Sequence, residues 1–178
     1  MANNLNGSVE ESRFPVSVIM AHEQITVGQW NVPRWRVVGV IAGEPSGEGD
    51  SAGRMIHDES GMQQFLWSGF EIRLYKDATE SYWLNLVGKQ PSLFVVCRED
   101  QADGNCVPLV VTANYDEAGA YMEADGTVMS APLPPEVYRW LEQYVVENFK
   151  PLEGKSRKRE AWFGNEAAQS LPPRGGRY

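Results

Sequence analysis

The stretch Phe70-Glu-Ile-Arg-Leu-Tyr-Lys-Asp-Ala-Thr-Glu80 predicts both a strand and a helix start. Apolar residues alternate with polar ones over its first half, which is the period of a strand with one buried face. Asp77 and Glu80 then have the spacing of a capping box, in which two side chains satisfy the free amides of a first helical turn. We therefore predict a strand over residues 64–76 and a short helix from residue 77 to Gly88.

A second helix pattern lies towards the C-terminus. Pro134-Pro135 opens it, since proline is favoured at the first helical position, and Lys150-Pro151 ends it. The spacing i, i+3, i+4, i+7, i+8, i+11 places the following residues on one face: Val137, Trp140, Leu141, Tyr144, Val145 and Asn148. Such a stripe predicts a helix packed on a core.

The rest of the chain supplies more strands and one more helix. Strands are predicted over residues 15–22, 34–41, 91–99, 108–113 and 127–131, and a short helix over Glu117–Glu123 after a second capping-box spacing at Asn114. In the strand 34–41, Trp35, Val37 and Gly39 share one predicted face and Arg36, Val38 and Val40 the other. The element order β-β-β-α-β-β-α-β-α predicts an α+β fold with a mainly antiparallel sheet and three helices.

The domain organisation follows from composition. Residues 1–12 are polar and unpatterned, which predicts a disordered lead, and residues 13–153 form a single α+β domain. Residues 43–61 are rich in glycine and acidic residues and predict a flexible loop that is either functional or merely disordered. Residues 154–178 predict a basic, flexible tail.

The formal net charge of −8 argues against nucleic acid or an anionic membrane as a partner, because both require a basic surface. The charge is divided: residues 1–153 hold 10 basic and 22 acidic side chains, and residues 154–178 hold 6 basic and 2 acidic. The sequence contains no apolar run of about 18 residues, so we predict no membrane span. Without a secretion-signal pattern at the N-terminus, we predict a cytoplasmic protein.

The sequence shows no pattern for a catalytic or metal site. Its two histidines, His22 and His57, do not belong to a ligand cluster, and neither a nucleophile elbow nor a phosphate-binding loop is present. We therefore predict no cofactor and no metal. Glu80 and the pair Asp116 and Glu117 have the residue type for general acid–base work, but each stands where a helix start uses a carboxylate. These patterns favour a non-enzymatic protein and leave an enzyme open.

Cys97 and Cys106 are the only cysteines. They can pair directly across a hairpin only if its turn is centred between Gln101 and Ala102, whereas Asp103-Gly104 is the stronger turn signal. Free thiols are the favoured interpretation in a cytoplasmic chain.

Aromatic side chains and the tail are the candidate partner-binding features. Trp30, Trp35, Tyr82 and Tyr115 belong to a set too numerous for a small core to hide, and Trp and Tyr are enriched at binding hot spots. Packing in the core is the alternative for most of them. The basic run Lys155, Arg157, Lys158 and Arg159, followed by Trp162, either docks on an acidic protein or is simply solvated.

Several segments together resemble a proteobacterial family of unknown function whose members are encoded beside molybdenum- or tungsten-dependent formate dehydrogenase and its accessory genes. The matching segments are 14–20, Trp30 and Trp35 running into 37–40, 80–86, 90–96 with Arg98, 114–118 with Tyr121, 128–134 and 155–159. Some relatives are assigned to molybdopterin–guanine dinucleotide biosynthesis, but this chain lacks the glycine-rich loop that such a transferase needs. The resemblance brings no catalytic residues with it.

Two hypotheses follow. The first is a non-enzymatic accessory or interaction protein whose partner, through the resemblance, is formate dehydrogenase or one of its assembly factors. The second is a small-molecule binding protein or an enzyme of molybdenum-cofactor metabolism. Its candidate site groups Glu80, Tyr82, Asn85 and Arg98, the arginine serving to hold an anionic ligand.

Overall fold

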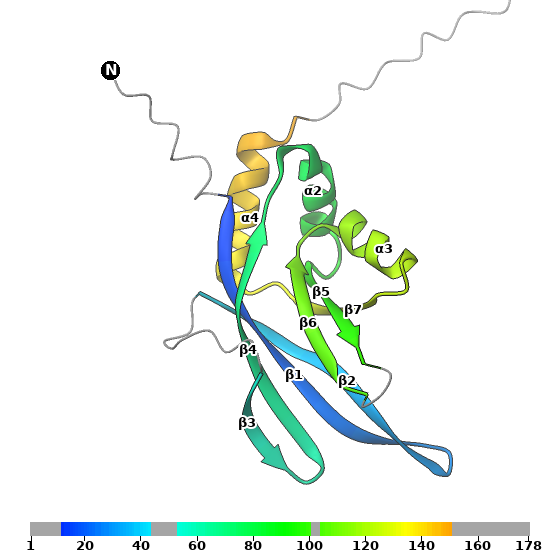
Figure 1. Cartoon of the computed structure of the whole chain (residues 1–178). Coiled ribbons are helices and arrows are strands. Elements are labelled where there is room, and N and C mark those ends of the chain that lie inside the picture. The colour runs from blue at the N-terminus through cyan, green and yellow to red at the C-terminus, as the bar shows by residue number, and fades with distance from the viewer. Residues whose placement is uncertain (1–11, 44–52, 101–103, 151–178) are drawn as a thin grey trace, which may run out of the picture.

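The computed structural model describes residues 12–43, 53–100 and 104–150, which form two antiparallel sheets and three α-helices (Figure 1). The first sheet has the order β2-β1-β4-β3 and the second the order β6-β5-β7. The strands are β1 (Arg13–Val27), β2 (Trp30–Ala42), β3 (Arg54–Glu59), β4 (Met62–Arg73), β5 (Ser92–Glu99), β6 (Cys106–Thr112) and β7 (Thr127–Pro132). The helices are α2 (Thr79–Val87), α3 (Tyr115–Glu123) and α4 (Pro135–Asn148), with a 3-10 turn η1 (Lys76–Ala78) before α2.

This arrangement confirms the α+β class, the antiparallel sheets and the three helices. It adds one strand to the predicted order, because Arg54–Glu59 forms β3 and pairs with β4. The prediction of a loop over the whole of 43–61 is therefore wrong for residues 54–59; residues 44–52 lie outside the described part. The predicted disordered lead and basic tail also fall outside it, apart from residue 12.

Two tight hairpins build the first sheet. Gly28 has φ +63° in the two-residue turn between β1 and β2, and Ser60 and Gly61 have φ +50° and +85° in the turn between β3 and β4. Positive φ values of this kind bend the chain in the sense that matches the twist of the flanking strands. Both hairpin tips project from the same end of the molecule, opposite α4 (Figure 1).

The core lies between the inner faces of the two sheets. Val16, Val18 and Met20 of β1 and Leu93 and Val95 of β5 are all buried there. The predicted stripe of α4 is confirmed: Val137, Leu141 and Val145 are buried in the same cluster, and Trp140 and Tyr144 pack against it. Figure 1 shows α4 beside the ends of β1 and β4 that lie away from the hairpin tips.

A bulge corrects the predicted faces of β2. The register with β1 shifts between Ile19 and Met20, whose partners are Gly39 and Val37, so Val38 is the extra residue. One extra residue reverses the alternation. Trp35, Val37 and Val40 therefore all pack on the core, and the prediction that placed Val40 opposite Trp35 and Val37 is wrong.

The two predicted helix caps have different outcomes. Asn114 caps α3 as its position predicts, since its side chain accepts hydrogen bonds from the amides of Asp116 and Glu117. Asp77 does not cap α2: it lies inside the 3-10 turn, the cap position is Ala78, and that residue makes no side-chain cap bond. Thr79 instead closes the turn by donating its hydroxyl to the Lys76 carbonyl over 3.1 Å.

Tyr82 links α2 to the end of β4. Its side chain has no exposed area, and its hydroxyl accepts a 3.2 Å hydrogen bond from the backbone N–H of Tyr75. Burial raises the pKa of Tyr82 to about 12, although the Tyr75 hydrogen bond acts in the opposite direction. The phenolate is therefore less stable in the folded protein than in the unfolded chain.

This burial predicts a loss of stability at high pH. The unfolded chain releases the Tyr82 proton near pH 10 and the folded protein near pH 12, so the stabilisation is complete below pH 10 and falls between the two values. A change of this size corresponds to at most ~2.7 kcal/mol of unfolding free energy. We expect urea denaturation from pH 9 to pH 12 to show a smaller decline for Tyr82→Phe than for the parent protein. Parallel curves would contradict the assignment.

In the described residues, no helix is long and apolar enough to cross a membrane.

Candidate functional site

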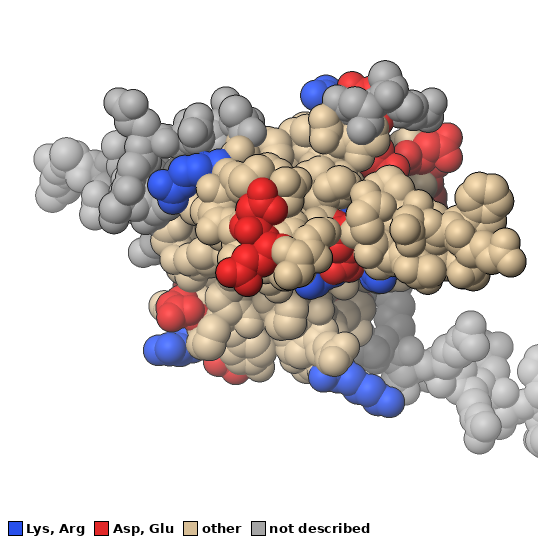
Figure 2. All heavy atoms as spheres, turned by 90° about the horizontal axis from the view of Figure 1, so that it is seen from below, with Lys and Arg blue, Asp and Glu red and all other residues tan. Residues whose placement is uncertain are grey.

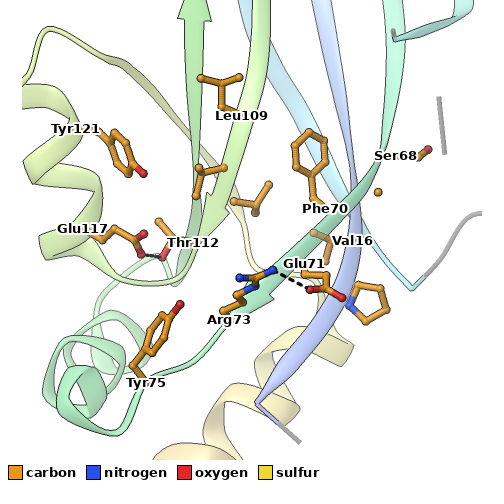
Figure 3. Close-up of a pocket in the computed structure, with 14 residues that line it drawn as sticks. Val16, Ser68, Phe70, Glu71, Arg73, Tyr75, Leu109, Thr112, Glu117 and Tyr121 are labelled. Atoms are coloured by element: carbon orange, nitrogen blue, oxygen red, sulfur yellow. Dashed lines mark hydrogen bonds and ion pairs between the residues drawn. The ribbon is translucent and has the colours of Figure 1, made fainter. Parts of the chain in front are cut away.

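A cleft of about 620 Å³ opens between β4 and β6, at the place where the two sheets diverge (Figure 3). Residues 68–71 and Arg73 line it from β4, and residues 109–112 line it from β6. Pro15 and Val16 of β1, Tyr75, and Glu117 and Tyr121 of α3 complete its wall. The volume is within the range of ligand-binding pockets.

Both strands present an unpaired edge to this cleft. β1 pairs with one edge of β4 as far as Arg73, whereas β3 covers the other edge only from Met62 to Leu66. β6 is the edge strand of its sheet and pairs only with β5. Within the described residues, no strand pairs with the cleft-facing edges of residues 67–73 and 106–112. Unpaired strand edges are the positions at which a sheet can receive another strand.

A bulge interrupts each of these edges. Val16 and Val18 of β1 pair with Phe70 and Trp67, so β4 carries an extra residue at Ser68-Gly69, where Gly69 has φ +87°. In β6 the register shifts so that Leu109 is the extra residue, and its side chain is exposed at the cleft. Bulges increase the local twist of a strand and are common beside binding sites.

The polar groups of the cleft gather around Arg73. Glu71 lies between two arginines, with its carboxylate 3.5 Å from Arg73 and 3.7 Å from Arg13. Exposed ion pairs of this kind contribute little energy and are easily exchanged. Figure 3 shows the hydroxyl groups of Tyr75 and Tyr121 pointing into the same space.

The second carboxylate of the cleft is held by the fold. Glu117 accepts a 2.7 Å hydrogen bond from the Thr112 hydroxyl, whose oxygen accepts a 3.0 Å bond from the amide of Asn114. The Thr112 hydroxyl thus bridges Glu117 and the amide of the cap residue Asn114, whereas in a capping box the glutamate would bond that amide directly. Among the described residues that line the cleft, Arg73 is the one basic side chain.

The cleft does not include the residues predicted as a ligand site. Tyr82 is buried, and the Asn85 side chain is hydrogen-bonded to backbone groups of Ser92 and Ala113. Glu80 is exposed on α2, and Arg98 is exposed near the end of β5. None of these four residues lines the cleft.

The predicted aromatic candidates divide between surface and core. Trp30 is 77% exposed at the tip of the β1–β2 hairpin. Trp35 stacks on His22 with ring centroids 4.7 Å apart, and its indole N–H donates to the Gly104 carbonyl over 2.9 Å. Tyr115 is exposed and meets Phe94 edge to face. Trp30 is therefore exposed enough to contact a partner protein as a binding hot spot. Trp35 instead connects β2 to the β5–β6 loop through its hydrogen bond to Gly104.

The surface around the tip of the β1–β2 hairpin is mostly uncharged (Figure 2). Val27 and Val32 are 56% and 41% exposed there, and pairing across the turn places Val27 on the same face as Trp30. Acidic and basic side chains appear on this view in small separate groups. The five tail candidates, Lys155, Arg157, Lys158, Arg159 and Trp162, lie outside the described residues.

The two cysteines are free and buried in the core. Cys97 pairs with Pro108 and Cys106 with Glu99, so the thiols are diagonal neighbours on one face of the β5–β6 hairpin. The hydrogen bond between the two thiols, together with burial, raises the pKa of Cys97, and the same bond lowers that of Cys106. Among the described residues, no cluster of three or more His, Cys, Asp or Glu side chains is placed to hold a metal ion.

Residues 15–159 match the model of a protein family described as DUF3305, a protein of unknown function. The chain belongs to the DUF3305 family. No curated protein matches the chain, and no solved structure does. The resemblance drawn from the sequence is thus confirmed as far as a family of unknown function, and its link to formate dehydrogenase stays a prediction.

The matched region of this DUF3305 protein contains every described side chain of the cleft and all the described strand pairings except those of Arg13 and Phe14 with β4. No cleft residue was kept as a site from the sequence; Glu117 was considered for acid–base work and assigned to the helix start instead. Arg73 and Tyr75 were recognised only as the polar half of a strand alternation. Ser68-Gly69 was the one local signal, because a glycine inside a strand pattern often marks a bulge or a close approach of another chain.

Proposed function

We propose that this chain is a non-enzymatic accessory protein of the cytoplasm that binds a partner protein in the cleft between β4 and β6. The observation that carries the proposal is the pair of strand edges, unpaired among the residues that the structure describes, that face each other across one cleft. Sheet edges left open in this way bind polypeptide through backbone hydrogen bonds. The polar groups around Arg73 add a charged contact that a backbone alone does not supply.

The partner that we propose is formate dehydrogenase or one of its assembly factors. The support is the resemblance of segments between residues 14 and 160 to a family encoded beside those genes. Two further contacts belong to this proposal: Trp30 at the hairpin tip, and the basic tail residues 155–159 with Trp162. They extend the binding surface beyond the cleft.

A charge reversal at Arg73 tests this proposal in the native host. We expect a tagged full-length chain to recover a formate dehydrogenase subunit or assembly factor, identified by mass spectrometry. Arg73→Glu places a second carboxylate beside Glu71, and we expect it to reduce that recovery by about tenfold or more. Lys89→Glu makes the same change in charge at an exposed residue after α2 and serves as the control.

Three outcomes contradict parts of the proposal. Equal recovery with Arg73→Glu and the parent protein removes the cleft as the binding site. Recovery of a different protein through the cleft keeps the accessory role and removes formate dehydrogenase. A chain recovered alone supports the second candidate function.

That second candidate is the binding of a small anionic molecule, as in molybdenum-cofactor metabolism. The observation that favours it is the convergence of Arg73, Tyr75 and Tyr121 on a cleft of about 620 Å³. An arginine with neighbouring hydroxyl groups suits a phosphate or carboxylate. Thermal-shift measurements with pterin and nucleotide ligands test this candidate, with Arg73→Glu as the variant that should abolish any stabilisation.

A further inference from the structure

We infer that Trp162 and Phe163 of the C-terminal tail dock on the outer, apolar face of α2 in the same chain. Both residues follow the part of the chain that the structure describes. The inference goes beyond the proposed function, because it concerns where the tail lies before a partner protein binds.

Helix α2 buries polar side chains and exposes apolar ones. Two of its buried residues carry hydroxyl groups, Thr79 and Ser81. Three apolar residues are instead 39%, 56% and 60% exposed: Trp83, Leu84 and Val87. They lie on one side of the helix, since Val87 is three residues after Leu84 and four after Trp83. Surface helices usually expose polar side chains there, and an apolar patch in their place indicates an interaction surface.

The described part of the chain ends beside this face. Phe149 follows α4 and stacks on Trp83, with ring centroids 5.3 Å apart and an interplanar angle of 10°. Lys150 is the last residue that the structure describes. Figure 1 shows this end of α4 next to α2. The tail therefore starts one residue after a side chain that already contacts the apolar face.

The length of the tail permits a return to α2. Trp162 comes twelve residues after Lys150, and a flexible chain of that length spans roughly 20 Å on average. α2 has nine residues, which makes it about 14 Å long. Such a tether gives an effective concentration in the millimolar range, so a contact with a Kd of about 0.1 mM is occupied for about 90% of the time.

Charge favours the chain's own tail over a second copy as the occupant. Residues 1–153 hold 10 basic and 22 acidic side chains, a net charge of −12, and residues 154–178 hold 6 basic and 2 acidic, a net charge of +4. The tail is therefore attracted to the body of its own chain, whereas two whole chains of charge −8 repel each other. The position of the contact is specified by the apolar face and by the place where the described chain ends.

Photo-crosslinking of the purified full-length chain tests the inference. p-Benzoyl-phenylalanine in place of Trp162 keeps a large aromatic side chain at that position, and mass spectrometry identifies the residues it joins. We expect the main product to join position 162 to residues 83–87 within one chain, with a yield independent of protein concentration. Leu84→Ser should lower this yield about fivefold or more. Leu109→Ser is the matched control, since Leu109 is an exposed leucine on β6, and it should leave the yield unchanged.

Fluorine NMR follows the natural tail without a cross-linking group. In the full-length chain labelled with 5-fluorotryptophan, Trp162→Phe and Trp83→Phe assign two of the signals. We expect the Trp162 signal to lie away from its position in a free peptide of residues 155–166 and to move towards it in Leu84→Ser. The Leu109→Ser variant should show the parent signal.

Two results would overturn the inference. Cross-links between two chains, with a yield that rises with concentration, would assign the α2 face to the tail of a second copy. Cross-links to other surfaces, or a Trp162 signal at the free-peptide position, would show that the tail does not dock on α2. Neither measurement contains a partner protein, so a failure here leaves the proposed function standing, and a failure of partner recovery in the host leaves the docking result unchanged.

Discussion

Replacing Leu141 with alanine is expected to lower the free energy of unfolding by about 2–5 kcal/mol. Leu141 has no exposed area and lies between Val137 and Val145 on the buried face of α4. These three side chains belong to the same core cluster as the inner faces of both sheets. The truncation removes apolar contacts and leaves a cavity where a helix, two sheets and their connections meet.

Urea denaturation followed by tryptophan fluorescence measures this loss. Val146→Ala is the matched control, because Val146 follows Val145 on the same helix and is 77% exposed. Its effect should stay within about 0.5 kcal/mol. Similar losses for the two variants would mean that α4 does not pack on the core by the face described.

The elements that the sequence predicted well are those specified by neighbouring residues. The stripe of α4 depends only on spacing along one helix, and Pro135 at its start removes an amide that would otherwise lack a partner. The cap at Asn114 depends on amides two and three residues away. Such local signals can be recognised without knowing what the segment packs against.

β3 could not be predicted from its own residues. The segment Arg54–Glu59 contains only two apolar side chains, Met55 and Ile56, and both are exposed. It is a strand because the turn at Ser60 and Gly61 returns the chain along β4, which supplies the pairing edge. Ser60-Gly61 was the available signal for a hairpin turn, but the acidic and glycine-rich residues before it favoured a loop.

The cleft depends on sheet order and on bulges, which sequence patterns do not specify. Residues 68–73 and 109–112 are separated by a helix and a strand, and they face each other only because β4 and β6 are placed along one seam. The bulge at Val38 likewise reversed a strand face that a regular alternation had assigned. Asp77 failed as a cap for a local reason: it lies inside the 3-10 turn, α2 begins two residues later, and the Thr79 hydroxyl closes that turn.

Replacing Asn85 with alanine is expected to lower the free energy of unfolding by about 2–4 kcal/mol. The Asn85 amide nitrogen donates to the carbonyls of Ser92 and Ala113 over 2.8 and 2.9 Å, and its oxygen accepts from the Ser92 amide over 3.0 Å. One side chain thus ties α2 to the start of β5 and to the end of β6. Alanine leaves three partly buried backbone groups without these partners.

Asn148→Ala provides the comparison, because that amide makes one hydrogen bond, to the Tyr144 carbonyl near the end of α4. We expect it to cost about 1 kcal/mol or less. Chemical denaturation of both variants should therefore separate them clearly. Equal costs would show that the Asn85 bonds are replaced by water and do not hold the two strands.

The same variant distinguishes a structural role for Asn85 from the ligand role that its sequence position suggested. If Asn85 only ties strands together, Asn85→Ala should lose stability and still recover the partner protein when measured well below its unfolding midpoint. If Asn85 contacts a ligand, affinity should fall while the folded fraction is unchanged. The three backbone bonds and the absence of Asn85 from the cleft lining predict the first result.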